Sequence, residues 1–394
     1  MIVARGLQAG HRLAKAATAC LLCFACGSQS PSQPGTAGSG GSTGGAGAGG
    51  AGIGPGGAPS GGSSGSMATG GAGTGPFGGA GGGGAGGAGL SGGSGGTNAT
   101  AGAAGAAGSV GPIVPAQVAG TSKYRFSSGD TILEIDAQTG ARVSKLSLSG
   151  ADLIVTSATD PTTWGSVFWT SPRIDVWMPE WPPPAAIDNS PYSATISGSH
   201  LMTTGTADTS LGVAMLKDYA LDATSGWITI NYTINATKAQ KAAPWEVSRV
   251  PRGGITFFPL GSATSLLAGP LTVTKTDGIV WFDDASKTAT SSDGSKLLAD
   301  GMGGWEAYAF GGNLFLKRFA DQPTSLQAPG EGEICIYPGA SWLEFEVQGP
   351  YTQIAKDGSL AWKMQWRIVK IPSSVTVAVG SASLVTFVQQ QLAL

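Results

Sequence analysis

Two glutamates placed two positions apart, Glu344 and Glu346, are the first candidates for chemistry in this chain. In a β-strand the side chains alternate between the two faces, so both carboxylates would share one face with Trp342 and Gln348. The strand rise would separate the two groups by roughly 7 Å. Such a pair could act as general acid and general base on a sugar, or accept hydrogen bonds from its hydroxyls. The competing interpretation is a solvated strand face.

A tryptophan-rich stretch, residues 164–184, supplies the second set of candidates. Large rigid rings such as Trp177 and Trp181 can form the wall of a cleft for a flat, partly apolar ligand such as a sugar, and they can equally fill a core. Arg173 and Asp175 lie among the rings. One interpretation of these two residues is an ion pair that caps an aromatic loop.

The third set lies in the segment APWEVSRVPRGG, which contains Trp245, Glu246, Arg249 and Arg252. We expect Trp245, Glu246 and Arg249 to contact a ligand, although only one face of this strand is expected to meet a cleft. The guanidinium groups of Arg249 and Arg252 could recognise the carboxylate of an acidic sugar.

The remaining reactive side chains favour structural roles. His200 is a lone histidine in an expected strand, and Cys335 is flanked by two isoleucines, which is typical of a buried, inert thiol. One histidine and one cysteine after residue 113 do not make a transition-metal cluster, and Asp283 and Asp284 fit a turn better than a hard-cation site. We therefore expect no metal and no cofactor.

The composition divides the chain into unlike parts. It has 394 residues, 66 of them glycine, and a formal net charge of −2. Residues 27–112 consist mostly of Gly, Ala and Ser, so this stretch cannot bury enough apolar surface to fold and is expected to be a disordered linker. The charges after it are spread singly, which argues against a nucleic-acid partner. Residues 113–394 are expected to hold the folded domain.

The N-terminus predicts export. Basic residues precede a short apolar run at positions 16–25, which is too short to span a bilayer and is typical of a signal peptide. The run ends in LLCFAC, which resembles a bacterial lipoprotein signal over residues 1–26. The resemblance implies that Cys26 is lipidated and, because Gly27 follows it, that the anchor lies in the outer membrane. A plain secretory peptide is the alternative.

The folded part reads as many short strands separated by turn residues. In the segment WITINYTINAT, Ile228, Ile230, Tyr232 and Ile234 alternate with polar residues, a period of two. An apolar stripe at helical spacing occurs only near the C-terminus, in SASLVTFVQQQLAL. The pattern predicts an all-β fold, a large antiparallel sandwich with a short C-terminal helix.

Several of these segments resemble galactose-mutarotase-like (aldose epimerase-like) domains. The opening YRFSSGDTILEIDAQTGARVSKLSLSGADLIV, the order of the later strands, and the segment SWLEFEVQGPYTQIAKDGSLAWKMQW are similar to that superfamily over about residues 120–372. The resemblance implies a supersandwich with a sugar site on its concave face. It also implies that Arg173 contacts sugar hydroxyls there and that Trp342, Glu344 and Glu346 lie at the site.

One feature of active aldose epimerases is missing. Their acid histidine would follow the strand WITINYTINAT, and this chain has Pro244, Trp245 and Glu246 there. The resemblance therefore points to a lipid-anchored, exported protein that binds carbohydrate without epimerase chemistry. The alternatives are a sugar-active enzyme that uses glutamates as acid and base, and a structural lipoprotein with no ligand.

Overall fold

The computed structural model describes residues 111–172, 182–261, 271–290 and 296–394. The expected signal peptide with Cys26 and nearly all of the expected linker lie outside these ranges. Within them, no helix has the length and apolar character needed to cross a membrane.

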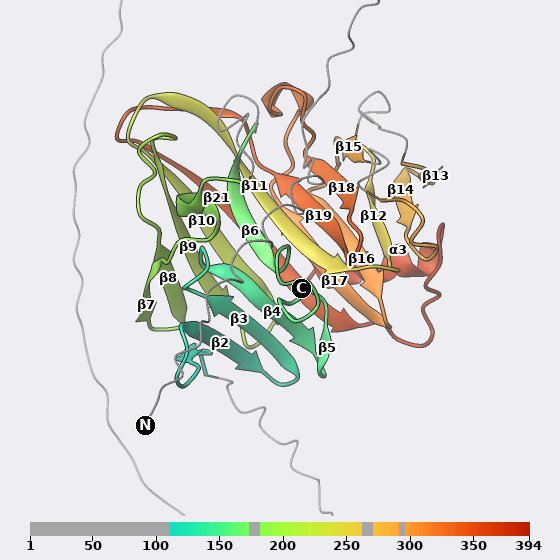
Figure 1. Ribbon diagram of the computed structural model, residues 1–394. Helices are drawn as coiled ribbons and strands as arrows, with labels where there is room; N and C mark the ends of the chain where they lie inside the picture. Colours follow the sequence, from blue (N-terminus) through green and yellow to red (C-terminus); the bar gives the residue numbers. More distant parts are fainter. Residues whose placement is uncertain (1–110, 173–181, 262–270, 291–295) are drawn as a thin grey trace, which may run out of the picture. The chain divides into compact units, whose positions relative to one another are not determined.

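The described chain forms two large antiparallel sheets, as predicted (Figure 1). The eleven-stranded sheet contains, in spatial order, β1 (Ala116–Gln117), β2 (Lys123–Ser128), β3 (Thr131–Asp136), β4 (Arg142–Leu148), β6 (Ser166–Ser171), β11 (Gln240–Pro251), β19 (Trp342–Gln348), β18 (Ile334–Pro338) and β15 (Leu297–Ala299), with β5 (Ala151–Asp152) beside β4 and β20 (Thr352–Ile354) beside β11. The expectation of a large antiparallel sandwich is confirmed.

The ten-stranded sheet follows the same antiparallel pattern. Its strands, in spatial order, are β13 (Thr274–Thr276), β14 (Ile279–Asp283), β12 (Ile255–Pro259), β16 (Trp305–Phe310), β17 (Asn313–Phe319), β21 (Ser359–Lys370), β10 (Ile228–Ala236), β9 (Val213–Leu221), β8 (His200–Thr204) and β7 (Ser193–Ser197). Short helical segments lie at α2 (Ala185–Asp188) and Thr324–Leu326.

The main core fills the space between the two sheets. Along β10 buried and half-buried residues alternate, which confirms the period of two in the sequence. Phe168 of β6 stacks on Tyr232 of β10 with ring centroids 4.1 Å apart, and Phe345 of β19 meets Phe315 of β17 edge-on at 5.4 Å. These rings identify the inward faces of β6 and β19.

The C-terminal helix α3 (Ala382–Leu392) is also confirmed. Leu384, Phe387 and Val388 join a second apolar cluster with rings of the ten-stranded sheet. The Ser381 side chain accepts a hydrogen bond from the Leu384 N–H at the start of the helix, and Arg318 donates to the Leu392 carbonyl at its end. Both helix ends therefore have partners for otherwise unsatisfied backbone groups.

Candidate functional site

The eleven-stranded sheet carries polar and aromatic side chains on the face turned away from the main core. Strands β6, β11, β19 and β18 lie side by side in it (Figure 1). On β19, Phe345 points into the core, so the neighbouring Glu344 and Glu346 occupy the opposite face. We call this face the polar face; its residues used below are Trp169, Trp245, Arg249, Cys335, Trp342, Glu344 and Glu346.

An ion pair lies at the centre of the polar face. Arg249 and Glu344 are direct neighbours in the register of β11 and β19. The Arg249 Nε and Nη2 atoms each lie 3.2 Å from the Glu344 Oε1 atom, and the two side chains are only 4% and 3% exposed. The guanidinium carbon also lies 5.4 Å from the Trp169 ring centroid and 5.9 Å from that of Trp342. The arginine is thus held by a carboxylate and two aromatic rings.

Glu346 is held by a different kind of partner. Its Oε2 atom accepts a hydrogen bond from the Trp245 indole N–H at 2.6 Å, and its Oε1 atom accepts one from the Cys335 thiol at 3.2 Å. Trp245 in turn meets Trp169 edge-on, with centroids 5.1 Å apart. The expected sharing of one face by Trp342, Glu344 and Glu346 is confirmed, and Cys335 is buried as expected, beside Glu346.

A second buried ion pair, which the sequence reasoning missed, extends the polar face. The Asp188 Oδ1 atom accepts hydrogen bonds from Arg142 at 3.1 Å and from the Trp169 indole N–H at 3.0 Å. Arg142 and Arg249 also both donate to the Trp164 carbonyl. Burial lowers the pKa of Arg142 to about 10, although the Asp188 charge opposes this shift. Asp188 therefore orients Trp169 on the polar face.

The turn before β4 allows this arrangement. Gly140 has a φ of 61°, and a Cβ atom there would lie 2.0 Å from the Asp188 carbonyl oxygen, so only glycine fits against α2. Arg142 follows two residues later in the Gly-Ala-Arg turn of the first hairpin. That short motif was the available signal, but its partner Asp188 is 46 residues away along the chain.

Glu246 does not join the polar face. Its Oε1 atom accepts hydrogen bonds from the Ser166 and Ser248 hydroxyls, and its Oε2 atom lies 2.6 Å from the Lys317 ammonium of the opposite sheet. Glu246 is fully buried between the sheets. We correct the expected placement of Glu246 beside Trp245 and Arg249, because adjacent strand residues point to opposite faces.

Arg252 also has a different place from the one expected. It forms a two-pronged ion pair with Asp284, with both nitrogen–oxygen distances at 2.6 Å. Its guanidinium therefore already has a carboxylate partner. Of the other candidates, Arg173, Trp177 and Trp181, together with Asp175, lie outside the described residues.

His200 lies away from the polar face, in β8 of the other sheet. It is exposed, and its Nδ1 atom lies 2.9 Å from the Asp218 carboxylate. Among the residues that the structure describes, no group of three His, Cys, Asp or Glu side chains is arranged to hold a metal ion.

A buried lysine supports the turn behind Arg142. The Lys217 ammonium donates to the Gly140 carbonyl at 2.6 Å and to the Ala141 carbonyl at 3.3 Å. Burial, together with the Arg142 charge, lowers the pKa of Lys217 to about 7, against opposing effects of Asp188 and Glu246. This amine thus links the ten-stranded sheet to the turn that carries Arg142.

The Lys217→Met substitution is expected to weaken the pH dependence of stability. Because the folded pKa is below that of an unfolded lysine, the unfolded chain binds more protons between the two values, and wild-type stability rises with pH there. We expect a rise of about 1 kcal/mol per pH unit between about pH 8 and 10 that Lys217→Met lacks. Urea unfolding across this pH range measures the change in unfolding free energy. Lys363→Met, which replaces an exposed lysine, is the control. If the unfolding free energy rose equally with pH in the wild type and in Lys217→Met, the lowered pKa of Lys217 would be refuted.

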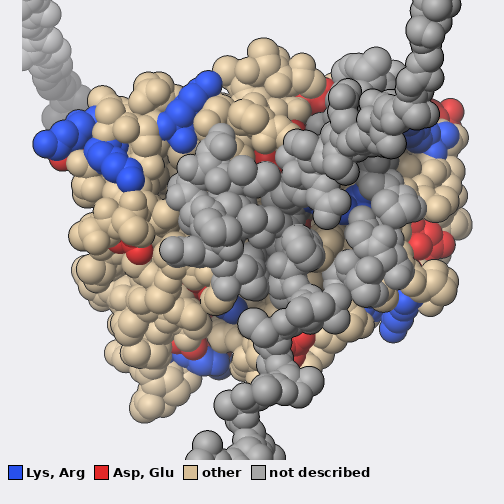
Figure 2. Space-filling model, turned by 45° about the horizontal axis from the view of Figure 1, so that its top comes forward, with Lys and Arg blue, Asp and Glu red and all other residues tan. Residues whose placement is uncertain are grey.

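The polar face brings carboxylate oxygens, guanidinium nitrogens and indole rings together within one small area of sheet, and these side chains are buried. Glu344 is engaged by a guanidinium, and Glu346 by an indole N–H and a thiol, so both carboxylates act as hydrogen-bond acceptors. On the side of the molecule that Figure 2 shows, blue and red residues are scattered among the tan ones.

No protein-family model matches the chain, and no curated protein matches it. Similar solved structures include a galactose mutarotase-like protein from Lactobacillus casei, with a TM-score of 0.46 and 11% identity, over 62% of this chain and 99% of that one. A galactose mutarotase-like protein from Clostridium acetobutylicum has a TM-score of 0.39 and 10% identity, over 66% and 98%. Galactose 1-epimerase from Lactobacillus acidophilus has a TM-score of 0.41 and 10% identity, over 64% and 95%. Each of these likenesses covers about two thirds of this chain and nearly the whole of the solved protein.

Proposed function

We propose that this protein binds carbohydrate on the polar face of the eleven-stranded sheet. The observation that carries the proposal is the joined set of rings and charges at that face. Trp169 and Trp342 flank the Arg249–Glu344 pair, and Trp245 donates to Glu346. Aromatic rings beside paired hydrogen-bonding groups match the apolar faces and hydroxyls of a sugar.

The proposal also places the protein outside the cytoplasm, held at the outer membrane by a lipid on Cys26. This part rests on the LLCFAC sequence and on the basic residues before it. A mass spectrum of the mature N-terminus that shows a diacylated Cys26 would support the anchor, and an unmodified residue there would exclude it.

Binding fits the polar face better than acid–base catalysis. A general acid and a general base need carboxyl groups that can exchange protons with the substrate. Here the Glu344 carboxylate is tied to the Arg249 guanidinium, and Glu346 accepts hydrogen bonds from Trp245 and Cys335. These partners favour carboxylates that position a ligand.

The Glu344→Gln and Glu346→Gln substitutions are expected to weaken sugar binding by about 1–3 kcal/mol each, because each removes a charged acceptor from a hydrogen-bonded set. Calorimetric titration with neutral hexoses and their oligomers measures the loss. Glu134→Gln is the matched control, since Glu134 of β3 pairs with Arg125 of β2, away from this cluster. Affinity that is unchanged in both variants would count against the proposal.

A further inference from the structure

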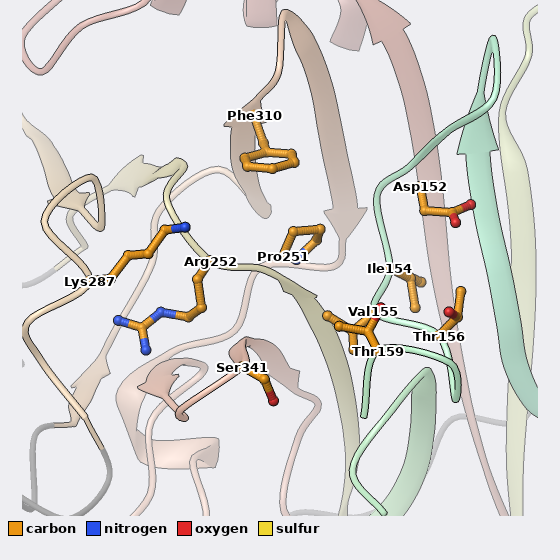
Figure 3. Close-up of a pocket in the computed structure, with 10 residues that line it drawn as sticks. All are labelled: Asp152, Ile154, Val155, Thr156, Thr159, Pro251, Arg252, Lys287, Phe310 and Ser341. Carbon is orange, nitrogen blue, oxygen red and sulfur yellow. The ribbon is translucent and has the colours of Figure 1, made fainter. Parts of the chain in front are cut away.

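A cavity of about 360 Å³ lies at the end of β11, beyond the polar face (Figure 3). We call it the β11-end pocket. Residues from several separate parts of the chain line it, among them Thr156, Pro251, Lys287, Phe310 and Ser341. Its size is at the lower end of the range for sites that take small molecules.

The walls of this pocket are fixed by contacts that do not depend on a ligand. The Arg252–Asp284 ion pair joins the end of β11 to the segment that follows β14. The Val155 N–H donates to the Arg249 carbonyl at 2.8 Å, and the Ser341 hydroxyl donates to Asp160 at 2.7 Å. A preformed cavity needs little ordering when it binds, so less binding free energy is lost.

Lys287 supplies the positive charge of the pocket. Its side chain crosses Gly253, where φ is 100° and an added Cβ atom would lie 2.8 Å from the Lys287 Cε atom. In Figure 3 its ammonium points toward the space between Pro251 and Phe310. Within the described ranges, no carboxylate lies at ion-pair distance from this ammonium, whereas Arg252 is already paired with Asp284.

The rest of the lining combines apolar side chains with hydroxyl groups. Phe310 and Pro251 form the apolar side, and Phe310 lies nearly parallel to Tyr308, with centroids 6.0 Å apart. Thr156 and Ser341 bring hydroxyl groups. The acidic residue of the lining, Asp152, lies across the pocket from Lys287 and is paired with Lys145 at 3.0 Å.

We propose that the β11-end pocket binds a small hydroxylated carboxylate of the size of a hexuronate. The carboxylate pairs with Lys287, the ring lies against Phe310 and Pro251, and the hydroxyls face Thr156 and Ser341. The recognition of an acidic sugar that the sequence suggested for Arg249 and Arg252 thus moves to Lys287, because both arginines already hold carboxylates.

The test is a titration with D-glucuronate that is followed by NMR of isoleucine methyl groups. Ile154 lines the pocket and reports on it locally. We expect a saturable shift of the Ile154 signal, and an affinity about tenfold lower in Lys287→Met, because that variant lacks one charge-assisted contact. Lys287 is exposed, so this variant should fold normally, and Lys275→Met, an exposed lysine on β13, should bind as the wild type does.

The outcomes separate this pocket from the polar face. D-Glucose should shift the Ile154 signal less than D-glucuronate at equal concentration. An Arg249→Met/Glu344→Leu variant, which alters the polar face, should keep the Ile154 response. The proposal would be overturned if D-glucuronate caused no saturable shift of the Ile154 signal. It would also be overturned if Lys287→Met bound D-glucuronate as tightly as the wild type does, or if the wild type bound D-glucose equally well.

Discussion

The Lys317→Met substitution is expected to lower the free energy of unfolding by about 3–5 kcal/mol, because it leaves buried acidic side chains without their cation. Lys317 is fully buried between the sheets, 2.6 Å from the Glu246 Oε2 atom and 3.5 Å from the Glu306 Oε1 atom. Burial raises the pKa of Glu306 well above its usual range, while Lys317 opposes the shift. Burial therefore favours the protonated form of Glu306, and Lys317 lies closer to Glu246 than to Glu306.

Urea unfolding at pH 7 measures this loss, and two further variants test its cause. Adding Glu246→Gln to Lys317→Met should restore part of the stability, because no buried charge then lacks a partner. Glu306→Gln alone should be neutral or stabilising. The raised pKa of Glu306 costs the folded state stability as pH rises above the unfolded pKa, and glutamine removes that cost. A Lys317→Met protein that is as stable as the wild type would show that the buried charge cluster is wrongly assigned.

The Arg249→Met substitution is the second change with a large expected effect. It removes the guanidinium that pairs with the Glu344 carboxylate, which is 3% exposed, so we expect a loss of about 3–5 kcal/mol in unfolding free energy. It also removes the group that lies between the Trp169 and Trp342 rings. Sugar binding should be lost together with stability, as calorimetric titration and urea unfolding can show in parallel.

The double variant Arg249→Met/Glu344→Leu separates the two effects. Replacing a buried ion pair by apolar side chains of similar volume is often neutral for stability, so this protein should unfold close to the wild type. Its sugar binding should remain absent, because the hydrogen-bonding groups of the polar face are gone. Wild-type affinity in the stable double variant would mean that the ligand binds elsewhere.

The strands that could be predicted are those along which apolar residues alternate with polar ones. Along β10 every second residue is buried, so the period of two could be seen directly. On β19 the glutamates alternate with Leu343, Phe345 and Val347, which placed Glu344 and Glu346 on one face correctly. The stripe on α3 was equally clear, because one side of that helix packs against the sheet.

The placement of Glu246 could not be predicted because polar residues of β11 point to both of its faces. From Ala242 to Val250 every residue is buried, so polar and apolar residues do not alternate in a way that marks the core. Charged residues lie on both sides: Glu246 meets Lys317 in the core, and Arg249 meets Glu344 on the polar face. The pairing of β11 with its neighbouring strands decides which of its faces points into the core and which belongs to the polar face.

The Arg142–Asp188 ion pair could not be predicted from the sequence for a different reason. Arg142 begins β4, and Asp188 ends the one-turn helix α2, which the fold brings beside it. Neither residue has a local pattern that points to the other. Long-range contacts of this kind follow from how β4, β6 and α2 pack, which the order of strands in the sequence does not specify.

The most direct test of the proposed function is a sugar titration followed by NMR of the tryptophan indole N–H groups. Trp169 and Trp245 donate through these groups to Asp188 and Glu346 on the polar face, whereas Trp281 and Trp366 are buried elsewhere. Sugar binding on the polar face predicts saturable shifts of the Trp169 and Trp245 signals, with those of Trp281 and Trp366 unchanged. If neutral hexoses and their oligomers shift neither Trp169 nor Trp245, the polar face is not a sugar site.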